Sequence, residues 1–451
     1  MKRYLKELKP NRLEDIIAMV ALYRPGPMDL IPDYIARKKG KEPITYIHPT
    51  MEKTLSNTYG VIVYQEQVMD MATELAGLTK GQGYLLIKAV GKKIKSLLDE
   101  QKDKFINGCL NNKIGQATAT KAWELIEPFA RYGFNKAHSA CYATIAYQTA
   151  YLKANYPEEF MAAFMNSETG DIERVSFLIE ECKQMGIEVL SPDINESFEK
   201  FAVIKINEKP GIRFGLTGVK NVGENVVKAL IQERQNGQFK TIDSFVSRIG
   251  HKDLNKKSLE SLVKCGAADS LGERNALLAN LENLLSYARE KQKHSSMGQV
   301  SLFGDTVEAN LPPLRLVNAE PAKSWEKLMW EKELLGLYVS NHPLNSYQTQ
   351  LKLEKVIPIK SLTINTTGKF KIAGVVTKIH KIVTKNGRPM IFSNLEDLTS
   401  KIELVVFPNV LEKNPEAWKE NNVVIARGSI NDRDGTLKFL CDEVTPLIAG
   451  A

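Results

Sequence analysis

The sequence has few cysteines, and they are not arranged as metal ligands. Its five cysteines lie far apart, and neither a C-x-x-C motif nor a nearby pair of histidines accompanies them. A disulfide framework and a zinc site are therefore not expected, and the thiols should be reduced in a cytosolic protein.

The sequence also lacks a long uncharged apolar run. No stretch is long enough to cross a bilayer, and residues 1–10 carry charges with no apolar segment behind them, unlike a signal peptide. We therefore expect a soluble, cytoplasmic protein that has no membrane partner.

The sequence has the ordinary composition of a globular protein and a positive net charge. Its 451 residues are 43% hydrophobic and 25% charged, which is typical of a soluble chain with several domains. The formal net charge of +8 is compatible with a nucleic-acid partner. It does not require one, because a mild lysine excess is more often a solvated surface.

Residues 131–151 combine aromatic rings, cations, a histidine and a glycine in a loop that continues as a helix. Asn135 or Ser139 could cap this helix. Backbone N–H groups and the helix dipole favour anions at a helix N-terminus, so Lys136 and His138 mark a candidate polyphosphate site. Neighbouring rings could stack on a base. A buried aromatic helix with a polar start is the alternative.

The rest of residues 1–170 is expected to be mainly helical. Two prolines around a glycine in Arg24–Pro27 predict a rigid turn after an apolar helix. The lysines that follow Gly91, Lys92 and Lys93 among them, could meet phosphates. A solvated lysine cluster explains them equally well.

Residues 171–295 contain two units that resemble a helix-hairpin-helix. In Leu216–Leu230 two glycines bracket a short turn that opens a helix, and a more degenerate copy spans Lys256–Leu271. Glycine lets the backbone approach a DNA phosphate, which turn N–H groups bind without reading the base. Packed helical hairpins without DNA are the alternative. The residues expected to contact duplex DNA are Gly218, Lys220, Gly223 and Lys228.

A helix expected from Glu273 to about Lys293 ends in a basic, polar run. It leads into Gln299-Val300-Ser301-Leu302-Phe303, in a setting rich in glycine. Exposed Leu and Phe side chains favour a partner pocket. An amide anchor followed by two apolar anchors is typical of a groove-binding linear motif. A loop packed on its own domain is the alternative.

From residue 369 the hydrophobic period becomes two, which predicts strands. A helix is expected near Pro415–Glu420, between the third strand and the fourth, and this is the order of an OB-fold barrel. The expected strands are Lys369–Thr384, Met390–Leu398, Lys401–Phe407, Val423–Ile430 and Thr436–Val444. Cations along the first hairpin suit single-stranded nucleic acid, although lysines also protect edge strands. These cations include Lys378, Lys381, Lys385 and Arg388.

Several motifs, in their order along the chain, closely resemble the fingers region of the bacterial replicative DNA polymerase III alpha subunit family (C-family polymerases). They are Ala21–Pro27, Tyr59–Met69, Ala89–Lys93 and Tyr132–Ser139, and Tyr156–Met161 and Leu335–Leu344 continue the match. The resemblance covers essentially the whole chain. It implies an α+β multidomain protein: mainly α-helical fingers and a tandem helix-hairpin-helix region, then a C-terminal five-stranded OB-fold β-barrel.

The resemblance implies template-directed DNA synthesis with two metal ions held by palm aspartates. Nothing in this chain resembles the motif of those aspartates. The chain therefore looks like a C-terminal part of the subunit that begins inside the catalytic core. We expect Mg²⁺ to be bound by residues outside the chain, no catalytic or metal-binding residue within it, and no activity from the chain alone.

By resemblance, the fingers would bind the incoming nucleotide. Tyr132 would stack near the base, and His138 would lie against the sugar, where a bulky ring disfavours a ribose 2′-hydroxyl. Many relatives have two adjacent arginines where this chain reads Ile87-Lys88, so one bidentate phosphate donor is lost and the other is a lysine. The residues assigned to the nucleotide are Tyr132, His138, Lys136, Lys88, Lys92 and Lys93.

The resemblance also predicts domains and partners. The predicted domains are fingers at 1–170, a tandem helix-hairpin-helix duplex-binding domain at 171–295, a clamp-binding linker at 296–306, a connecting helix and loop at 307–366 and an OB-fold at 367–448. The sliding clamp would be bound by Gln299, Leu302 and Phe303. The other expected partners are primer-template DNA, single-stranded template, a dNTP and further replicase subunits.

Two other functions are compatible with parts of this pattern. The first is a non-enzymatic, clamp-tethered DNA-binding module derived from the same ancestor. The second is a repair factor built from helix-hairpin-helix and OB modules alone. The motifs of the fingers argue against the second, because a repair factor does not need a loop like that of Tyr132 and His138 facing a nucleotide.

Overall fold

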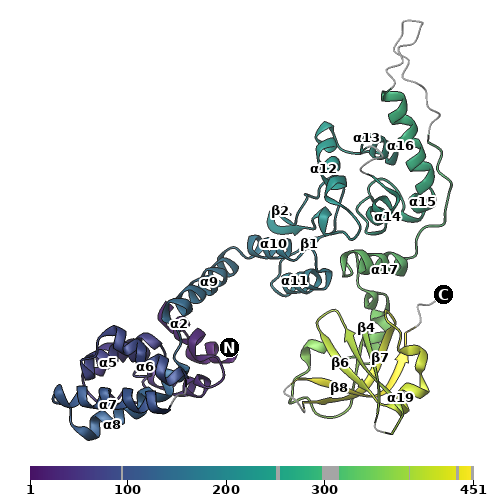
Figure 1. The fold of residues 1–451 in the computed structure, drawn as a ribbon. Coiled ribbons are helices and arrows are strands. Elements are labelled where there is room, and N and C mark those ends of the chain that lie inside the picture. Colours follow the sequence, from purple (N-terminus) through teal and green to yellow (C-terminus); the bar gives the residue numbers. More distant parts are fainter. Residues whose placement is uncertain (93–94, 250–253, 297–313, 385, 433–435, 448–451) are drawn as a thin grey trace. The chain divides into compact units, whose positions relative to one another are not determined.

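The computed structural model describes residues 1–92, 95–249, 254–296, 314–384, 386–432 and 436–447 (Figure 1). The chain forms two compact units, Met1–Pro157 and Glu158–Ala451. The described residues contain no helix that is both long and apolar enough to span a membrane.

The first unit is helical. Its helices are α1 (Lys2–Leu8), α2 (Leu13–Leu22), α3 (Ile31–Lys38), α4 (Met51–Leu55), α5 (Gln65–Ala76), α6 (Lys80–Lys92), α7 (Lys95–Asn111), α8 (Gln116–Tyr132) and α9 (Lys136–Asn155), with 3₁₀ turns η1 (Pro27–Leu30) and η2 (Ser56–Thr58). The predicted turn after α2 is present. Gly26 has a φ of 100° there, a conformation that residues other than glycine rarely adopt.

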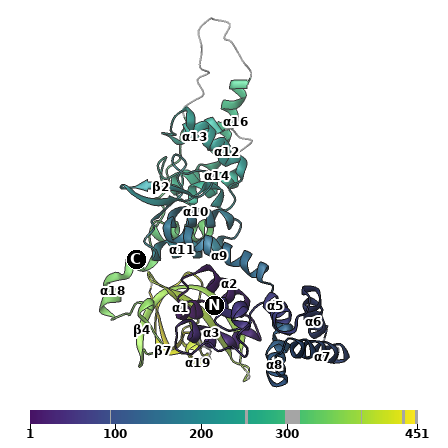
Figure 2. The ribbon, with the colours of Figure 1, turned by 90° about the vertical axis from the view of Figure 1, so that its left-hand side faces the viewer.

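Two apolar cores hold this unit together. One core joins α1, α2 and α3 and includes Leu22 and the fully buried Tyr34. The other lies among α5, α6, α7 and α8, which Figures 1 and 2 both show packed as one group of helices, and it contains Phe105 and Trp123. Helix α9 adds Ala143 to the first core, so the start of α9 is fixed against α2.

The second unit begins with helices around a small sheet. Its elements up to α17 are α10 (Pro157–Ser167), α11 (Ile172–Gln184), β1 (Val189–Leu190), β2 (Ala202–Ile206), β3 (Lys209–Arg213), η3 (Leu216–Gly218), α12 (Glu224–Glu233), η4 (Arg234–Asn236), α13 (Ile242–Ile249), α14 (Lys256–Lys264), α15 (Arg274–Ala279), α16 (Leu281–Ser296) and α17 (Ser324–Leu335). The sheet order is β1-β3-β2, with β1 parallel and β2 antiparallel to β3.

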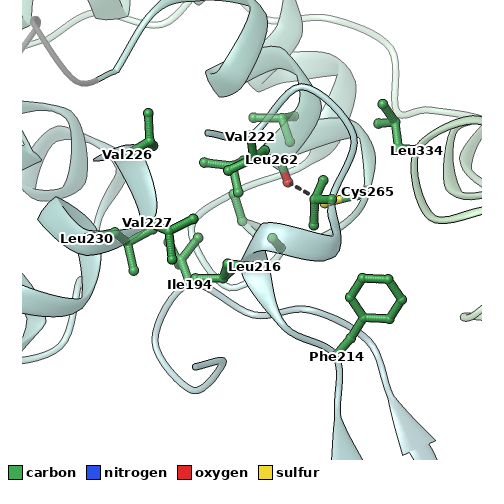
Figure 3. Packing of buried hydrophobic residues seen from close by; sticks show 14 of the residues in the cluster. Ile194, Phe214, Leu216, Val222, Val226, Val227, Leu230, Leu262, Cys265 and Leu334 are labelled. Carbon is green, nitrogen blue, oxygen red and sulfur yellow. Dashed lines mark hydrogen bonds between the residues drawn. The ribbon is translucent and has the colours of Figure 1, made fainter. Parts of the chain in front are cut away.

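One apolar core joins these helices to the sheet. Figure 3 shows Val226 and Leu230 of α12, Leu262 of α14 and Leu216 of η3 among the residues of this core. Helix α10 contributes Met161 to the same core. The two units therefore divide at Pro157, whereas the sequence predicted a boundary at residue 170.

The single helix predicted from Glu273 to about Lys293 is wrong, because Asn280 separates α15 from α16. The Asn280 amide group donates to the Val317 carbonyl and accepts from the Val317 N–H, both at 2.8 Å. The break thus provides hydrogen bonds to a returning segment that lies 37 residues further along the chain.

The predicted five-stranded barrel is confirmed. Its strands are β4 (Phe370–Val383), β5 (Pro389–Glu396), β6 (Lys401–Val406), β7 (Val423–Asn431) and β8 (Lys438–Pro446). They close in the order β4-β5-β6-β8-β7, with β6 and β8 parallel and the other pairs antiparallel. The barrel is preceded by η5 (Pro343–Tyr347), α18 (Gln348–Leu353) and η6 (Ile359–Ser361).

The helix between the third and fourth strands of the barrel lies earlier than predicted. It is α19 (Pro408–Lys413), and Pro415–Ala417 forms only the 3₁₀ turn η7. Asn414 between them is not helical, with φ −139° and ψ 65°. A residue before proline is disfavoured in the helical region, so the helix cannot continue through Pro415.

Candidate nucleotide and nucleic-acid interfaces

The start of α9 is capped by Asn135, one of the two candidates from the sequence. The Asn135 Oδ1 atom accepts a hydrogen bond from the His138 N–H at 2.8 Å. The fully buried Ser139 has a different role, because its hydroxyl donates to the Ile17 carbonyl of α2. The first turn of α9 is thereby joined to α2.

A residue that the sequence did not predict, Glu66, also contacts the start of α9. The Glu66 carboxylate accepts from the Lys136 N–H, at 3.1 Å to Oε1 and 3.0 Å to Oε2, and from the Asn135 side-chain amide at 3.0 Å. The two partners lie 69 and 70 residues beyond Glu66. No local sequence pattern could have indicated this contact.

The first turn of α9 carries a cluster of aromatic rings and cations. The exposed His138 ring lies 4.7 Å from the Tyr142 ring and 5.4 Å from the Phe134 ring, measured between centroids. The Arg24 guanidinium lies 4.5 Å from the Phe134 ring centroid, and the Lys136 ammonium 5.7 Å from that of Tyr64. Burial lowers the pKa of Arg24 from its ordinary value. Lys136 and His138 are thus both exposed on the first turn of α9, and each lies beside an aromatic ring.

The other predicted nucleotide residues are described less fully. Lys88 is exposed on α6. Tyr132 ends α8 and Lys92 ends α6, but their side chains lie outside the described part of the structure, as does the whole of Lys93.

The glycines of the first hairpin differ in their surroundings. A Cβ atom on Gly218 would lie 2.9 Å from the Phe214 ring, so glycine is required there by packing inside the domain. A Cβ atom on Gly223 would have no atom within 4 Å. Gly223 precedes α12 and gives it no side-chain cap, so the open backbone at this turn is that of Gly223.

The predicted cations of this hairpin are exposed, but part of their hydrogen-bonding capacity is used within the protein. The Lys220 backbone N–H donates to the Leu334 carbonyl of α17 at 3.0 Å. The Lys228 ammonium lies 3.4 Å from the Glu224 carboxylate one turn earlier on α12. An exposed pair of this kind contributes about 0.5 kcal/mol or less and is easily exchanged for a phosphate.

The second hairpin is held by a buried arginine. Gly266 has a φ of 87°, and a Cβ atom there would lie 2.3 Å from Arg274 Nη2. The Arg274 guanidinium binds the Asp269 carboxylate through two 2.8 Å hydrogen bonds and donates to the Lys264 carbonyl at 3.0 Å. This turn is therefore closed on its own domain.

On the barrel, two of the predicted cations are paired with carboxylates. The Lys378 ammonium lies 3.0 Å from the Glu173 carboxylate. Arg388 binds Glu412 through hydrogen bonds of 3.2 and 2.8 Å. Lys381 is exposed, and Lys385 lies outside the described residues.

His342 has a structural role at the start of η5. Its Nδ1 atom accepts from the Leu344 N–H at 3.2 Å and caps η5. Burial, together with the charge of Lys183, lowers its pKa from 6.5 to about 4. His342 lines a cavity of about 270 Å³, together with residues that include Glu396 and Asp397.

The predicted clamp-binding residues Gln299, Leu302 and Phe303 fall outside the described residues. Among the residues that are described, no three histidine, cysteine, aspartate or glutamate side chains gather where they could hold a metal ion.

Comparison with protein families gives three matches in chain order. The model of the bacterial DNA polymerase III alpha subunit finger domain matches residues 1–113. A helix-hairpin-helix motif matches residues 186–278, and an OB-fold nucleic acid binding domain matches residues 370–447. These ranges include α5 with Glu66, both hairpins and the whole barrel.

Curated relatives match the chain over nearly its full length. The chain is 42% identical over 451 residues to DNA polymerase III subunit alpha of Borreliella burgdorferi, covering 98% of this chain and 39% of that protein. It is 41% identical over 457 residues to the subunit of Thermus aquaticus and 42% identical over 453 residues to that of Aquifex aeolicus. These alignments cover 99% and 98% of this chain, and 37% of each relative.

Proposed function

Because the chain belongs to the family of bacterial DNA polymerase III alpha subunits, we propose that it forms the part of a replicative DNA polymerase that binds the incoming nucleotide and DNA. The chain spans 37–39% of the length of the relatives described above. The observation that carries the proposal is the match of the finger-domain model to residues 1–113, within a similarity that extends through the barrel.

In this proposal the first turn of α9 faces the nucleotide. His138 contacts the sugar, Tyr132 stacks near the base, and the lysines meet the triphosphate. The exposed rings of His138 and Tyr142, with the half-buried Phe134 beside them, support this assignment, because flat rings beside cations suit a nucleotide. Lys136, Lys88, Lys92 and Lys93 supply the positive charge.

DNA is bound by the second unit. The open turn at Gly223, with Lys220 and Lys228, contacts the backbone of the primer-template duplex. The barrel contacts the single-stranded template through Lys381 and Lys385, and through Lys378 and Arg388 once their carboxylate partners are exchanged for phosphates. A sliding clamp binds Gln299, Leu302 and Phe303, and other replicase subunits complete a cytoplasmic assembly.

The chemical step needs residues outside this chain. Mg²⁺ would stabilise the attacking and leaving oxygens of nucleotidyl transfer. No group of side chains suited to hold it is found in the described part of the chain. We assign the metal-binding carboxylates to the part of the polymerase that this chain does not span, because nothing in the sequence resembles the motif of the palm aspartates.

A primer-extension assay tests the proposal. The purified chain, given primed template, dNTPs and magnesium, should not extend the primer. Addition of the remaining part of the same polymerase, in trans or as a fusion, should restore extension. Robust extension by the chain alone would contradict our assignment of the metal site.

The same assay distinguishes a part of a DNA polymerase from a non-enzymatic, clamp-tethered DNA-binding module. If the remaining part of the polymerase never restores extension, while the chain still binds DNA and the clamp, the chain acts as a clamp-tethered DNA-binding module. That outcome would overturn the proposed part in DNA synthesis.

A further inference from the structure

Glu66 is a carboxylate that lies at the N-terminus of a helix distant in the sequence. It belongs to the first turn of α5, and its oxygens accept from the Lys136 N–H at 3.0 and 3.1 Å and from the Asn135 side chain at 3.0 Å. Hydrogen bonds to an ionised acceptor are among the stronger ones in proteins, and the helix dipole also favours a carboxylate at this end.

The loop that enters α9 is held on its other side by backbone contacts. The Gln65 N–H donates to the Phe134 carbonyl at 3.0 Å, and the Phe134 N–H donates to the Val63 carbonyl at 3.3 Å. Glu66 follows this bridge directly in the chain. Together the bridge and the carboxylate hold three consecutive residues, Phe134, Asn135 and Lys136, against the start of α5.

The orientation of His138 depends on this loop. Its backbone N–H is bound by the Asn135 side chain, whose amide group is in turn bound by Glu66. The imidazole ring lies between Phe134, which belongs to the bridge, and Tyr142 one turn later. A shift of Asn135 or Phe134 would therefore move the ring of His138.

We propose that Glu66 is a positioning residue for nucleotide selection: it holds the turn at Asn135 and Lys136, so that His138 presents its ring to the sugar in one orientation. This inference rests on the proposed function, in which His138 contacts the sugar. Glu66 itself does not touch the nucleotide. A ring whose orientation is fixed before binding discriminates between sugars better than a mobile one.

The position of His138 can be measured without any activity. In NMR spectra of the full chain with isotopically labelled histidine, the ring currents of Phe134 and Tyr142 should displace the His138 ring resonance. The H138Q variant lacks this resonance and so identifies it. Glu66→Ala should move this resonance toward that of a free histidine and leave the other five histidines unchanged. Glu66→Gln keeps one oxygen for both hydrogen bonds and should largely preserve the resonance.

Two further variants serve as a control and as a second test of the contact. Glu124→Ala removes an exposed carboxylate from α8 and should leave the His138 resonance in place. Lys136→Pro deletes the N–H that Glu66 binds, at the first helical position, where proline is well tolerated. Lys136→Pro should therefore move the His138 resonance in the way expected for Glu66→Ala. It tests the contact independently, also in the case that Glu66→Ala does not fold.

Sugar selection is then measured in the polymerase reconstituted from this chain and the remaining part. Glu66→Ala should lower the ratio of kcat/KM for a dNTP to that for the matching rNTP by about tenfold or more, because small displacements in a reaction site are costly. Glu66→Gln should stay close to the wild type. A loss of folding or of general activity would lower both rates and leave the ratio unchanged.

The outcomes separate this inference from the proposed function. If Glu66→Ala and Lys136→Pro both leave the His138 resonance in place, Glu66 does not position His138. If the resonance moves but the sugar ratio is unchanged, the proposed role in selection is wrong. If the reconstituted polymerase does not extend a primer at all, the proposed function fails, and with it the role in sugar selection, while the resonance still reports the contact.

Discussion

Arg274 and Glu331 form a buried ion pair, with 3.1 Å between Nη2 and Oε1. Their side chains are 5% and 2% exposed. Arg274 closes the turn of the second hairpin, and Glu331 lies on α17. The second Glu331 oxygen accepts from the N–H groups of Val339 and Ser340 at 3.0 and 2.9 Å. The hairpin is thus connected through one carboxylate to the segment that leads toward the barrel.

We expect Glu331→Ala to destabilise this region by about 3–5 kcal/mol, the usual cost of removing one partner of a buried pair. Arg274 would keep Asp269, but two backbone N–H groups would lose their acceptor. Amide hydrogen exchange of Val339 and Ser340 measures the loss locally. Glu333 is an exposed carboxylate on the same helix, and Glu333→Ala should change the free energy of opening measured by exchange by about 0.5 kcal/mol or less. Equal effects would contradict the inferred role of the pair.

Gly108 of α7 makes a close backbone contact with α5. A Cβ atom there would lie 2.2 Å from the Ala76 carbonyl oxygen and 2.9 Å from the Ala76 Cβ atom. We expect Gly108→Ala to destabilise the first unit by about 1–3 kcal/mol through overpacking. Thermal unfolding measures this as a lower Tm.

Gly81 of α6 provides the matched control, because a Cβ atom there would have no atom within 4 Å. Gly81→Ala should leave stability unchanged or raise it by up to about 1 kcal/mol, since alanine is the better helix former. A similar loss of stability in both variants would show that the close contact between Gly108 and Ala76 does not cause the destabilisation.

The features that sequence alone could predict are those with local causes. The barrel strands follow from alternation along each strand, and the cap at Asn135 from the residue that precedes a helix. The break at Asn280 depends on Val317, and the requirement for glycine at Gly108 depends on Ala76. Such partners are determined by the tertiary fold, so no short window of sequence contains them.

The candidate site shows the same division. His138 and Lys136 stand out in their own motif, whereas Glu66 is identified by a contact across 70 residues. Lys378 was predicted as a DNA-binding cation from its place on a basic hairpin. The pattern could not show that Glu173, 205 residues earlier, is its partner.

That pairing leads to a prediction about single-stranded DNA. Lys381→Ala should weaken binding to a labelled oligonucleotide and reduce the slope of log affinity against log salt by about 0.7, the value for one phosphate contact. Lys378→Ala should have a smaller effect, because Lys378 must first leave Glu173. Glu173→Gln should increase affinity. Fluorescence anisotropy over a salt series checks all three variants, and an unchanged slope for Lys381→Ala would exclude that contact.

For the clamp-binding motif we expect the apolar anchors to dominate. Replacing Leu302 and Phe303 with alanine should abolish clamp binding, since buried anchors of an interface often contribute about 2 kcal/mol or more each. DNA binding should be largely retained. Ser301→Ala, between the amide and apolar anchors, is the control and should bind the clamp normally. Surface plasmon resonance with immobilised clamp measures each variant, and unchanged affinity of the double variant would refute the assignment.

His342 should make the stability of the second unit depend on pH. Its folded pKa of about 4 lies below the ordinary value of 6.5, because burial and the nearby charges of Lys183 and Lys332 disfavour the imidazolium. Asp397 acts in the opposite direction. A neutral histidine is therefore favoured in the folded state. Its stabilising contribution is present above pH 6.5 and is lost progressively as the pH falls toward 4.

The expected loss is about 2 kcal/mol between pH 7 and pH 5, and hydrogen exchange of the Leu344 amide, which His342 binds, can measure it. His342→Asn keeps an acceptor for that amide and cannot titrate, so its free energy of opening should change much less over the same range. Protonation of carboxylates that are paired in the folded protein also lowers its stability at acidic pH, but this loss is the same in the wild type and in His342→Asn. The difference between wild type and variant therefore isolates His342, and parallel pH profiles would show that its protonation is not coupled to folding.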